Sequence, residues 1–128
     1  MPRRTEPDPN TAKIGARLRE LRLERNMSLA DLADTALVSK GHLSSIEHGL
    51  AAITIQTISR LATGLNVPAM YLLVSPTDSD VDQVAELLRK LPQPELVKLR
   101  RELAKSAKES AKAAAKTHRV QSGARVLR

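Results

Sequence analysis

Five short segments between residues 11 and 75 each combine a helix-starting residue with apolar residues placed three and four positions apart. That spacing gathers the apolar side chains on one face of an α-helix. No segment alternates apolar and polar residues for long enough to predict a β-strand. Short amphipathic helices cover their apolar faces by packing on one another, so residues 11–75 predict a five-helix, all-α domain.

Capping residues mark the ends of these helices. Asn26 and Gly49 are expected to close the first and third helices, because both residue types tolerate left-handed backbone. Ser28 and Asp31 have the spacing of a capping box, in which each side chain accepts a hydrogen bond from the other residue's backbone N–H. The expected start residues are Asn10 or Thr11, Ser28, Ser39, Thr54 and Pro68.

The core of this domain has to be aliphatic. The chain has one aromatic residue, Tyr71, and no cysteine, so disulfides cannot hold the fold together. A protein that stacks single-stranded bases on aromatic rings is also disfavoured. The side chains expected on the apolar helix faces are Ile14, Leu18, Leu21, Leu29, Leu32, Ala33, Ala36, Leu43, Ile46, Ile55, Ile58, Leu61, Ala62, Leu65, Tyr71, Leu72 and Leu73.

Two further helices are predicted after residue 75, and they form the expected C-terminal hairpin of residues 76–117. The first spans residues 80–90, and the second runs from Pro94 or Glu95 to about Lys116, because the prolines of segment 91–94 interrupt the helix. Residues 1–10 are expected to be a disordered arm, and residues 118–128 a disordered basic tail. The hairpin carries apolar residues that either pack back on the first domain or, as we favour, form a homodimer: Val81, Val84, Leu88, Leu91, Leu96 and Leu99.

The charge of the chain is concentrated at its C-terminal end. The net charge is +7, and residues 96–128 alone hold 10 basic and 2 acidic side chains. Such a basic block indicates an anionic partner, although charge runs are as often solvated helix faces. The lysine-rich helix therefore has three interpretations: a solvated extension, a second DNA-contacting arm, or an interaction helix for another macromolecule. A membrane ranks last, because the helix lacks large apolar residues in its second half.

Other functions find little support in the sequence. His42, His48 and His118 have no third or fourth donor at zinc-ligand spacing, and no glycine-rich phosphate loop is present. Carboxylates one helical turn apart, such as Glu20 and Glu24, are typical of a solvated surface. No apolar run suits a signal peptide or a membrane span. We expect a cytoplasmic protein that is not an enzyme and needs no metal or cofactor.

The second and third predicted helices are joined by an unusually short turn. Ala33 and Ser39 are six residues apart, so the two helices must cross steeply with a small residue at their contact. Leu43 and Ile46 anchor the third helix to the core. The residues expected to face solvent are all small, polar or basic, and a helix of that kind can enter a major groove about 12 Å wide: Lys40, Gly41, His42, Ser44 and Ser45.

These segments resemble the Cro and phage-repressor type of helix-turn-helix domain, the xenobiotic-response-element-like family of bacterial regulators. Residues 14–22 (IGARLRELR) resemble its first helix, residues 28–33 (SLADLA) its second, and residues 39–49 (SKGHLSSIEHG) its recognition helix. Residues 61–68 (LATGLNVP) are similar to its closing helices. The resemblance covers residues 14–74 and implies a five-helix, lambda-repressor-like fold.

The resemblance also implies roles for individual residues. The bases would be read by Lys40, Gly41, Ser44 and Ser45, with His42 at the edge of the contact. Ser28 and Ser39 would present hydroxyl and backbone N–H groups to phosphates. Arg22 and Glu47 match an internal ion pair that ties the first helix to the recognition helix.

Two positions depart from the family's pattern. Leu37 stands where glycine is frequent, so either a bulky residue adopts positive φ at a cost of about 1 kcal/mol or the turn differs. Leu29 replaces a polar residue that often contacts phosphate. The domain also has few positive charges of its own, which makes a supplementary contribution from Arg3, Arg4 and the basic C-terminal helix plausible.

The sequence therefore predicts a regulator that binds double-stranded DNA sequence-specifically, as a dimeric repressor that reads a palindromic operator with the helix of residues 39–48. One alternative is an antitoxin or anti-regulator whose C-terminal helices bind a protein partner. Another is a sequence-tolerant DNA-coating protein driven by the basic tail.

Overall fold

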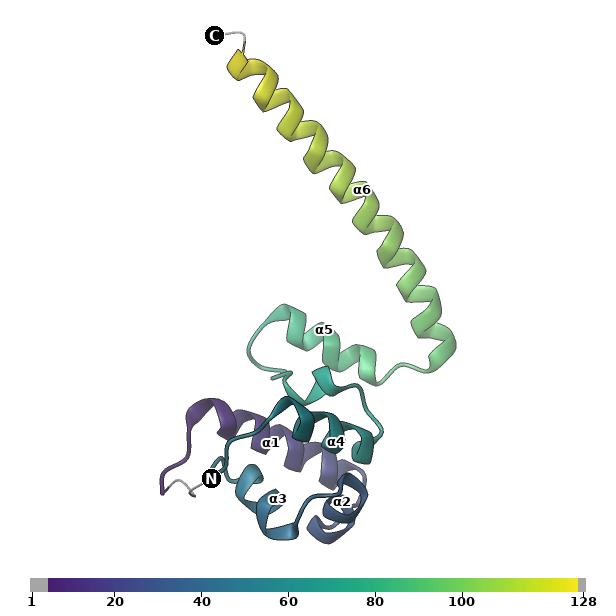
Figure 1. Ribbon diagram of the computed structural model, residues 1–128. Coiled ribbons are helices and arrows are strands. Elements are labelled where there is room, and N and C mark those ends of the chain that lie inside the picture. Colours follow the sequence, from purple (N-terminus) through teal and green to yellow (C-terminus); the bar gives the residue numbers. More distant parts are fainter. Residues whose placement is uncertain (1–4, 127–128) are drawn as a thin grey trace. The chain divides into compact units, whose positions relative to one another are not determined.

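A computed structural model describes the backbone of residues 5–126 and the side chains of residues 5–120. Every regular element in this part of the chain is a helix, which confirms the all-α prediction (Figure 1). The chain divides into two compact units, Met1–Leu87 and Leu88–Arg128. The elements are α1 (Pro9–Glu24), α2 (Leu29–Ala36), α3 (Lys40–Glu47), α4 (Ile55–Leu65), the 3-10 helix η1 (Ala69–Leu72), α5 (Asp80–Arg89) and α6 (Gln93–Val126).

The predicted capping residues start helices α2, α3 and α4. The Ser28 hydroxyl oxygen accepts a hydrogen bond from the Asp31 N–H at 3.0 Å, and the Asp31 carboxylate accepts one from the Ser28 N–H at 2.9 Å. The bond from the Ser28 N–H and, second to it, hydrogen bonding by the Ser28 side chain to the carboxylate lower the pKa of the Asp31 carboxyl. Ser39 accepts from the His42 N–H, and Thr54 accepts from the Thr57 N–H. Each bond satisfies an N–H that has no partner within its own helix.

The first helix begins earlier than predicted. Asp8 is its cap, since its carboxylate accepts from the Asn10 N–H at 2.8 Å, and Pro9 opens the helix because it has no N–H to leave unpaired. The Asp8 N–H also donates to the Gly49 carbonyl oxygen at 3.2 Å. The prediction of a disordered arm over residues 1–10 is therefore wrong for residues 8–10, and residues 1–4 lie outside the described part.

Among the described residues, three other than glycine adopt left-handed backbone. Asn26 and Asn66 follow the ends of α1 and α4 with φ of 54° and 55°. Leu37, with φ of 57°, ends α2 in the turn before α3, and its side chain is 79% exposed. Of the two alternatives for this turn, the structure takes the one in which leucine adopts positive φ.

The aliphatic core lies among α1, α2, α3, α4 and η1. Two residues of the predicted apolar faces are exposed to solvent: Ile55 is 84% exposed and Leu73 is 58% exposed. Both stand at the end of an element, and helical periodicity shows which face a residue occupies but not how far along the helix its neighbours reach. The buried residues of the core cluster are Leu18, Leu21, Leu32, Ala33, Ala36, Leu43, Ile46, Leu61, Ala62, Leu65 and Leu72.

The first unit extends past the predicted boundary at residue 75, because α5 is attached to α1. Ala85 on α5 is buried, and Glu86 forms an ion pair with Arg17, which is itself 4% exposed. The same guanidinium donates to the Tyr71 carbonyl oxygen at 3.0 Å and to Glu20 at 3.2 Å. Arg17 thus links α1 to both η1 and α5. No sequence pattern had singled it out.

Helix α6 is longer than predicted. It starts at Gln93 and continues to Val126, so the expectation of disorder over residues 118–128 is wrong as far as residue 126. Alanine, lysine, arginine and glutamine have high helix propensity, and no proline follows Pro94 to stop the helix. Residues 127–128 lie outside the described part of the chain. Among the described residues, no helix is long and apolar enough to cross a membrane.

Candidate nucleic-acid interface

Helix α3 is held against the first unit by its apolar side. Leu43 and Ile46 are fully buried, and α3 packs on both α1 and α2. The capping bond from the His42 N–H to Ser39 fixes its first turn. At its other end Gly49 adopts φ of 74°, and the Gly49 carbonyl oxygen accepts from the Thr11 hydroxyl at 3.1 Å. Both ends of α3 are therefore fixed, and its remaining side is presented to solvent.

Gly15 allows α1 and α3 to touch through their backbones. A Cβ atom at Gly15 would lie 2.3 Å from the Ile46 carbonyl oxygen and 2.7 Å from the Glu47 carbonyl oxygen. Such distances are impossible for a real side chain, so every residue with a Cβ would push the two helices apart. No residue pattern predicted this contact, although an isolated glycine inside a helical pattern often has a packing reason.

The structure brings Arg22 and Glu47 together between α1 and α3. The Arg22 Nε donates to Glu47 Oε1 at 2.6 Å and Nη2 donates to Oε2 at 3.1 Å, so the pair is bidentate. Arg22 Nη1 also donates to the Met27 carbonyl oxygen at 2.8 Å. The two side chains are only 9% and 4% exposed. Together with Gly15, this pair sets the position of α3 relative to α1.

The outward side of α3 contains most of the predicted base-reading residues. Lys40, Gly41 and His42 are exposed, and Ser44 is half-buried. A Cβ at Gly41 would meet nothing within 4 Å, so this stretch of the helix surface is open. The prediction that Ser45 faces solvent is wrong: it is 5% exposed, and its hydroxyl donates to the Gly41 carbonyl oxygen at 3.0 Å. Adjacent residues on a helix differ by about 100°, which turns Ser45 into the domain.

Ser28 and Ser39 differ in their suitability for phosphate. Both are exposed at helix N-termini, where the macrodipole attracts anions. At Ser28 the Asp31 carboxylate already occupies the Ser28 N–H, and its negative charge opposes an approaching phosphate. At Ser39 the only neighbouring charge within α3's first turn is that of Lys40. Ser39 is therefore the better of the two phosphate sites.

The first unit carries a negative net charge. Residues 1–87 contain nine basic and eleven acidic side chains, a net charge of −2. Two of the basic side chains, Arg17 and Arg22, are buried in ion pairs. Lys13 pairs with Asp78 at 2.9 Å and lowers the pKa of that carboxyl. The unit as a whole therefore does not attract a polyanion, and any attraction from the cations near α3 is confined to their immediate surroundings.

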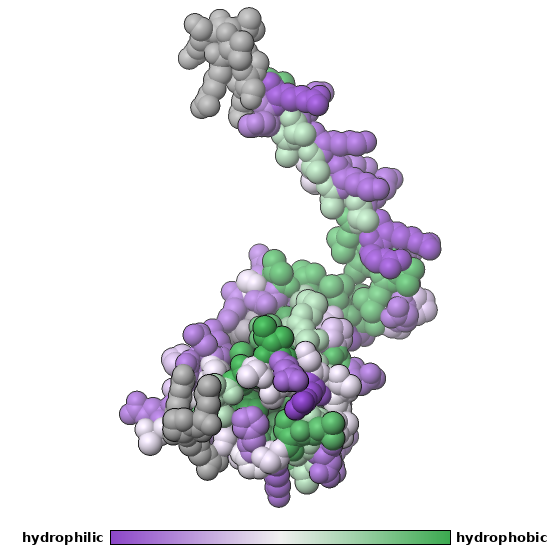
Figure 2. All heavy atoms as spheres, in the orientation of Figure 1, coloured by the Kyte–Doolittle hydropathy of each residue, from purple (hydrophilic) through white to green (hydrophobic). Residues whose placement is uncertain are grey.

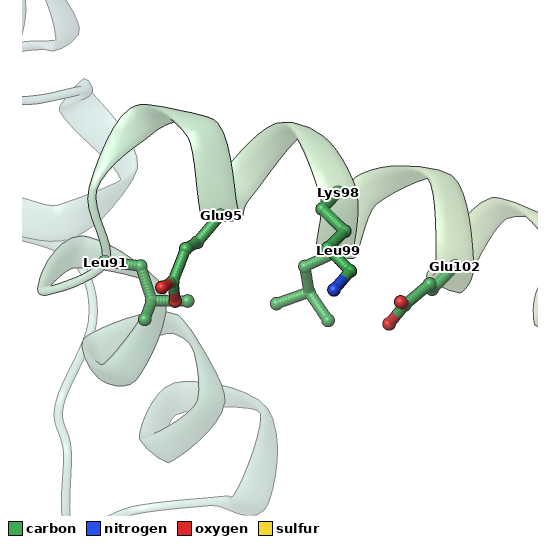
Figure 3. A pocket seen from close by; sticks show the side chains of 5 residues that line it. All are labelled: Leu91, Glu95, Lys98, Leu99 and Glu102. Atoms are coloured by element: carbon green, nitrogen blue, oxygen red, sulfur yellow. The ribbon is translucent and has the colours of Figure 1, made fainter.

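The residues proposed for dimerisation fall on two elements. On α5, Val81 and Val84 are 78% and 50% exposed, and Leu87, which the sequence analysis did not include, is 63% exposed. The remaining four, Leu88, Leu91, Leu96 and Leu99, are half-buried. In the second unit a shallow pocket of about 350 Å³ has apolar and charged walls (Figure 3), lined by Leu91, Glu95, Lys98, Leu99 and Glu102.

Among the described residues, no group of three or more histidine or carboxylate side chains could hold a metal ion.

Comparison with known proteins shows what the first unit is similar to. Residues 18–72 match the Helix-turn-helix family. HTH-type transcriptional regulator SutR of Escherichia coli (strain K12) is 38% identical over 71 residues, which cover 56% of this chain and 39% of SutR. HTH-type transcriptional regulator SinR of Bacillus subtilis (strain 168) is 36% identical over 70 residues, covering 54% of this chain and 63% of SinR. The chain thus spans less than two thirds of these relatives.

Solved structures agree with this match. The restriction-modification controller protein C.AhdI from Aeromonas hydrophila has a TM-score of 0.50 and 29% identity, covering 51% of this chain and 98% of C.AhdI. The hypothetical transcription factor NHTF from Neisseria has a TM-score of 0.53 and 25% identity, covering 57% of this chain and 86% of NHTF. The first unit is a helix-turn-helix domain. Its matched relatives are named as HTH-type transcriptional regulators.

Proposed function

We propose that this protein binds double-stranded DNA sequence-specifically and regulates transcription, with α3 in the major groove. The observation that carries the proposal is the construction of α3. Its inner side is locked to α1 by Gly15 and by the bidentate Arg22–Glu47 pair. Its outer side offers an exposed cation and an open glycine surface at Lys40 and Gly41. A rigid helix with a thin polar face is what base readout in a groove requires.

Within this proposal the exposed residues of α3 have distinct roles. Lys40 donates to guanine O6 or N7, or to a phosphate, and Ser44 contacts a base edge one turn later. His42 lies at the edge of the contact. Gly41 allows the helix backbone to approach the bases closely. Ser39 and the N-terminus of α3 receive a phosphate, which fixes the helix in register.

We further propose that the protein acts as a homodimer on a palindromic operator and represses by occupying a promoter. One short helix contacts only a few base pairs, so two-fold pairing is the usual way to reach useful specificity. The apolar surface for this pairing is on α5, where Val81, Val84 and Leu87 are exposed to water in the single chain. A second copy of the chain would cover it. Val84→Asp should lower the molar mass measured by light scattering to that of one chain. An unchanged mass would refute dimerisation through α5.

Selection of bound sequences from random duplex DNA tests the proposal directly. A palindromic consensus is expected, and its half-site spacing would report the dimer geometry. The Lys40→Ala/Ser44→Ala variant should then lose its preference for that consensus while keeping its unfolding midpoint. The matched control is Arg19→Ala/Ser59→Ala, which removes one exposed cation and one exposed hydroxyl outside α3. Unchanged discrimination by the Lys40/Ser44 variant would refute base readout by α3.

The alternative of an antitoxin or anti-regulator gives a different result. A small protein that co-purifies with the chain in a fixed ratio would support it. A random-sequence selection that yields no consensus would instead support the sequence-tolerant coating protein.

A further inference from the structure

The two units of the chain carry opposite charge. Residues 1–87 have a net charge of −2, whereas residues 88–128 contain twelve basic and three acidic side chains, a net charge of +9. A helix-turn-helix unit that is negative overall repels a polyanion at distances beyond its local contacts. If the proposed function holds, the long-range attraction to DNA has to come from another part of the chain.

The basic side chains of α6 form one narrow stripe. With about 100° between successive residues, seven of them fall within a sector of about 80°. At about 1.5 Å per residue, the stripe is about 32 Å long, close to the 34 Å of one turn of DNA. Glu102 and Glu109 lie at one edge of the sector rather than within it. Figure 2 shows hydrophilic side chains along one side of α6. The seven basic residues of the stripe are Lys98, Arg101, Lys105, Lys108, Lys112, Lys116 and Arg119.

After Leu103, the rest of the α6 surface is not suited to a protein or a lipid partner. Every residue from 101 to 120 is exposed. After Leu103, the side of α6 that faces away from the stripe has mainly alanine and serine, with no aromatic residue and no large apolar residue before Val120. Protein interfaces depend on large buried anchors, and interfacial membrane helices depend on a broad apolar face. A regular row of cations without large apolar side chains beside it suits a partner that carries evenly spaced negative charges.

We infer that the stripe on α6 is a second DNA-binding surface, which binds phosphates irrespective of base sequence. This inference rests on the proposed function for its choice of double-stranded DNA over other polyanions. Because α6 and the helix-turn-helix unit belong to one chain, binding of either raises the local concentration of DNA for the other. The stripe supplies affinity and its salt dependence, and α3 supplies sequence preference.

The test uses the full chain with four stripe lysines neutralised. If all four bind phosphate, the slope of log K against log salt should become shallower by about 3.6. Between 50 and 200 mM salt, the wild-type affinity should then fall on the order of 100-fold more than that of the variant. The matched control places four glutamines on the other side of α6, and far-UV circular dichroism checks that both helices are intact. The variant is Lys105→Gln, Lys108→Gln, Lys112→Gln and Lys116→Gln, and the control is Ala104→Gln, Ala107→Gln, Ala111→Gln and Ala114→Gln.

The expected result is weaker binding of the lysine variant to a selected operator and to an unrelated duplex by the same factor, with the control unchanged. An unchanged salt slope in the folded variant overturns the inference and leaves the proposed function standing. A shallower slope in a protein whose selection yields no consensus keeps the inference and overturns sequence-specific regulation. If the substitutions abolish binding to vesicles rich in phosphatidylserine but leave DNA binding intact, the stripe binds membranes and the inference is wrong.

Discussion

Removing Glu47 alone should destabilise the first unit more than removing Glu47 and Arg22 together. The two side chains form a bidentate ion pair at 2.6 and 3.1 Å and are 4% and 9% exposed. In Glu47→Leu, the Arg22 guanidinium keeps its bond to the Met27 carbonyl oxygen but stays buried without a counter-charge. In Arg22→Met/Glu47→Leu, no buried charge remains, and apolar side chains of similar length fill the space.

The magnitudes follow from the burial of the pair. Leaving one charge of a buried ion pair unpaired costs about 3–5 kcal/mol of unfolding free energy, whereas replacing both partners with apolar residues is often nearly neutral. At about 0.05–0.15 kcal/mol per residue, a unit of this size has about 4–13 kcal/mol in total. Glu47→Leu should therefore remove a large part of the stability, and the double variant should recover about 2 kcal/mol or more.

Tyr71 provides a specific probe, because it is the only aromatic residue of the chain and lies in the first unit. Its fluorescence during urea unfolding reports on that unit without a contribution from α6. As a control, Glu24→Gln removes an exposed partner of Arg25 at 3.5 Å and should change the unfolding free energy by less than about 0.5 kcal/mol. The reasoning is refuted if Glu47→Leu lowers the unfolding free energy by less than about 1 kcal/mol. It is also refuted if the double variant loses as much unfolding free energy as Glu47→Leu and Arg22→Met lose when their separate losses are added.

Substitutions at three other sites, with one control, test single features of the fold. Gly15→Ala should cost about 1–3 kcal/mol in urea unfolding, because its Cβ would overlap carbonyl oxygens of α3, whereas Gly41→Ala, with no atom within 4 Å of its Cβ, should cost nothing. Leu37→Gly should raise the unfolding free energy by about 0.5–1 kcal/mol by relieving positive φ at an exposed side chain, and a decrease would contradict this. Asp31→Asn should lower the unfolding midpoint at neutral pH. Because folding lowers the pKa of Asp31, the carboxylate's contribution to stability is complete above about pH 4 and disappears as the pH falls through the lowered pKa. The unfolding midpoints of the two proteins should therefore converge in acid.

Local signals in the sequence were read correctly because they act within a few residues. A serine at a helix start with an aspartate three positions later favours a capping box, and Ser28 and Asp31 form one. Asn26 takes left-handed backbone at the end of α1 for the same kind of reason. At the start of α1, Asn10 was an expected cap, but the cap is Asp8, two residues earlier. Pro9 follows Asp8 and favours the first position of the helix, because it has no N–H to leave unpaired.

Distant contacts could not be read in this way. Ser44 and Ser45 are identical and adjacent, yet only the packing of α3 on α1 and α2 decides that Ser45 is buried. Arg17 looked like any exposed helix cation, but it contacts Glu86, which is 69 residues away in sequence. Gly15 gave no sign of which backbone would approach it.

The sequence alone thus determined the helices, the capping residues of α2, α3 and α4, most of the apolar faces and the position of α3, because each depends on hydrogen bonds and side-chain spacing within one or two helical turns. The tertiary structure decided which of those faces are covered, how closely α1 and α3 approach at Gly15, and that α5 is attached to the helix-turn-helix unit through Arg17. These features depend on contacts between residues far apart in the chain, and periodicity within one helix carries no information about its neighbours.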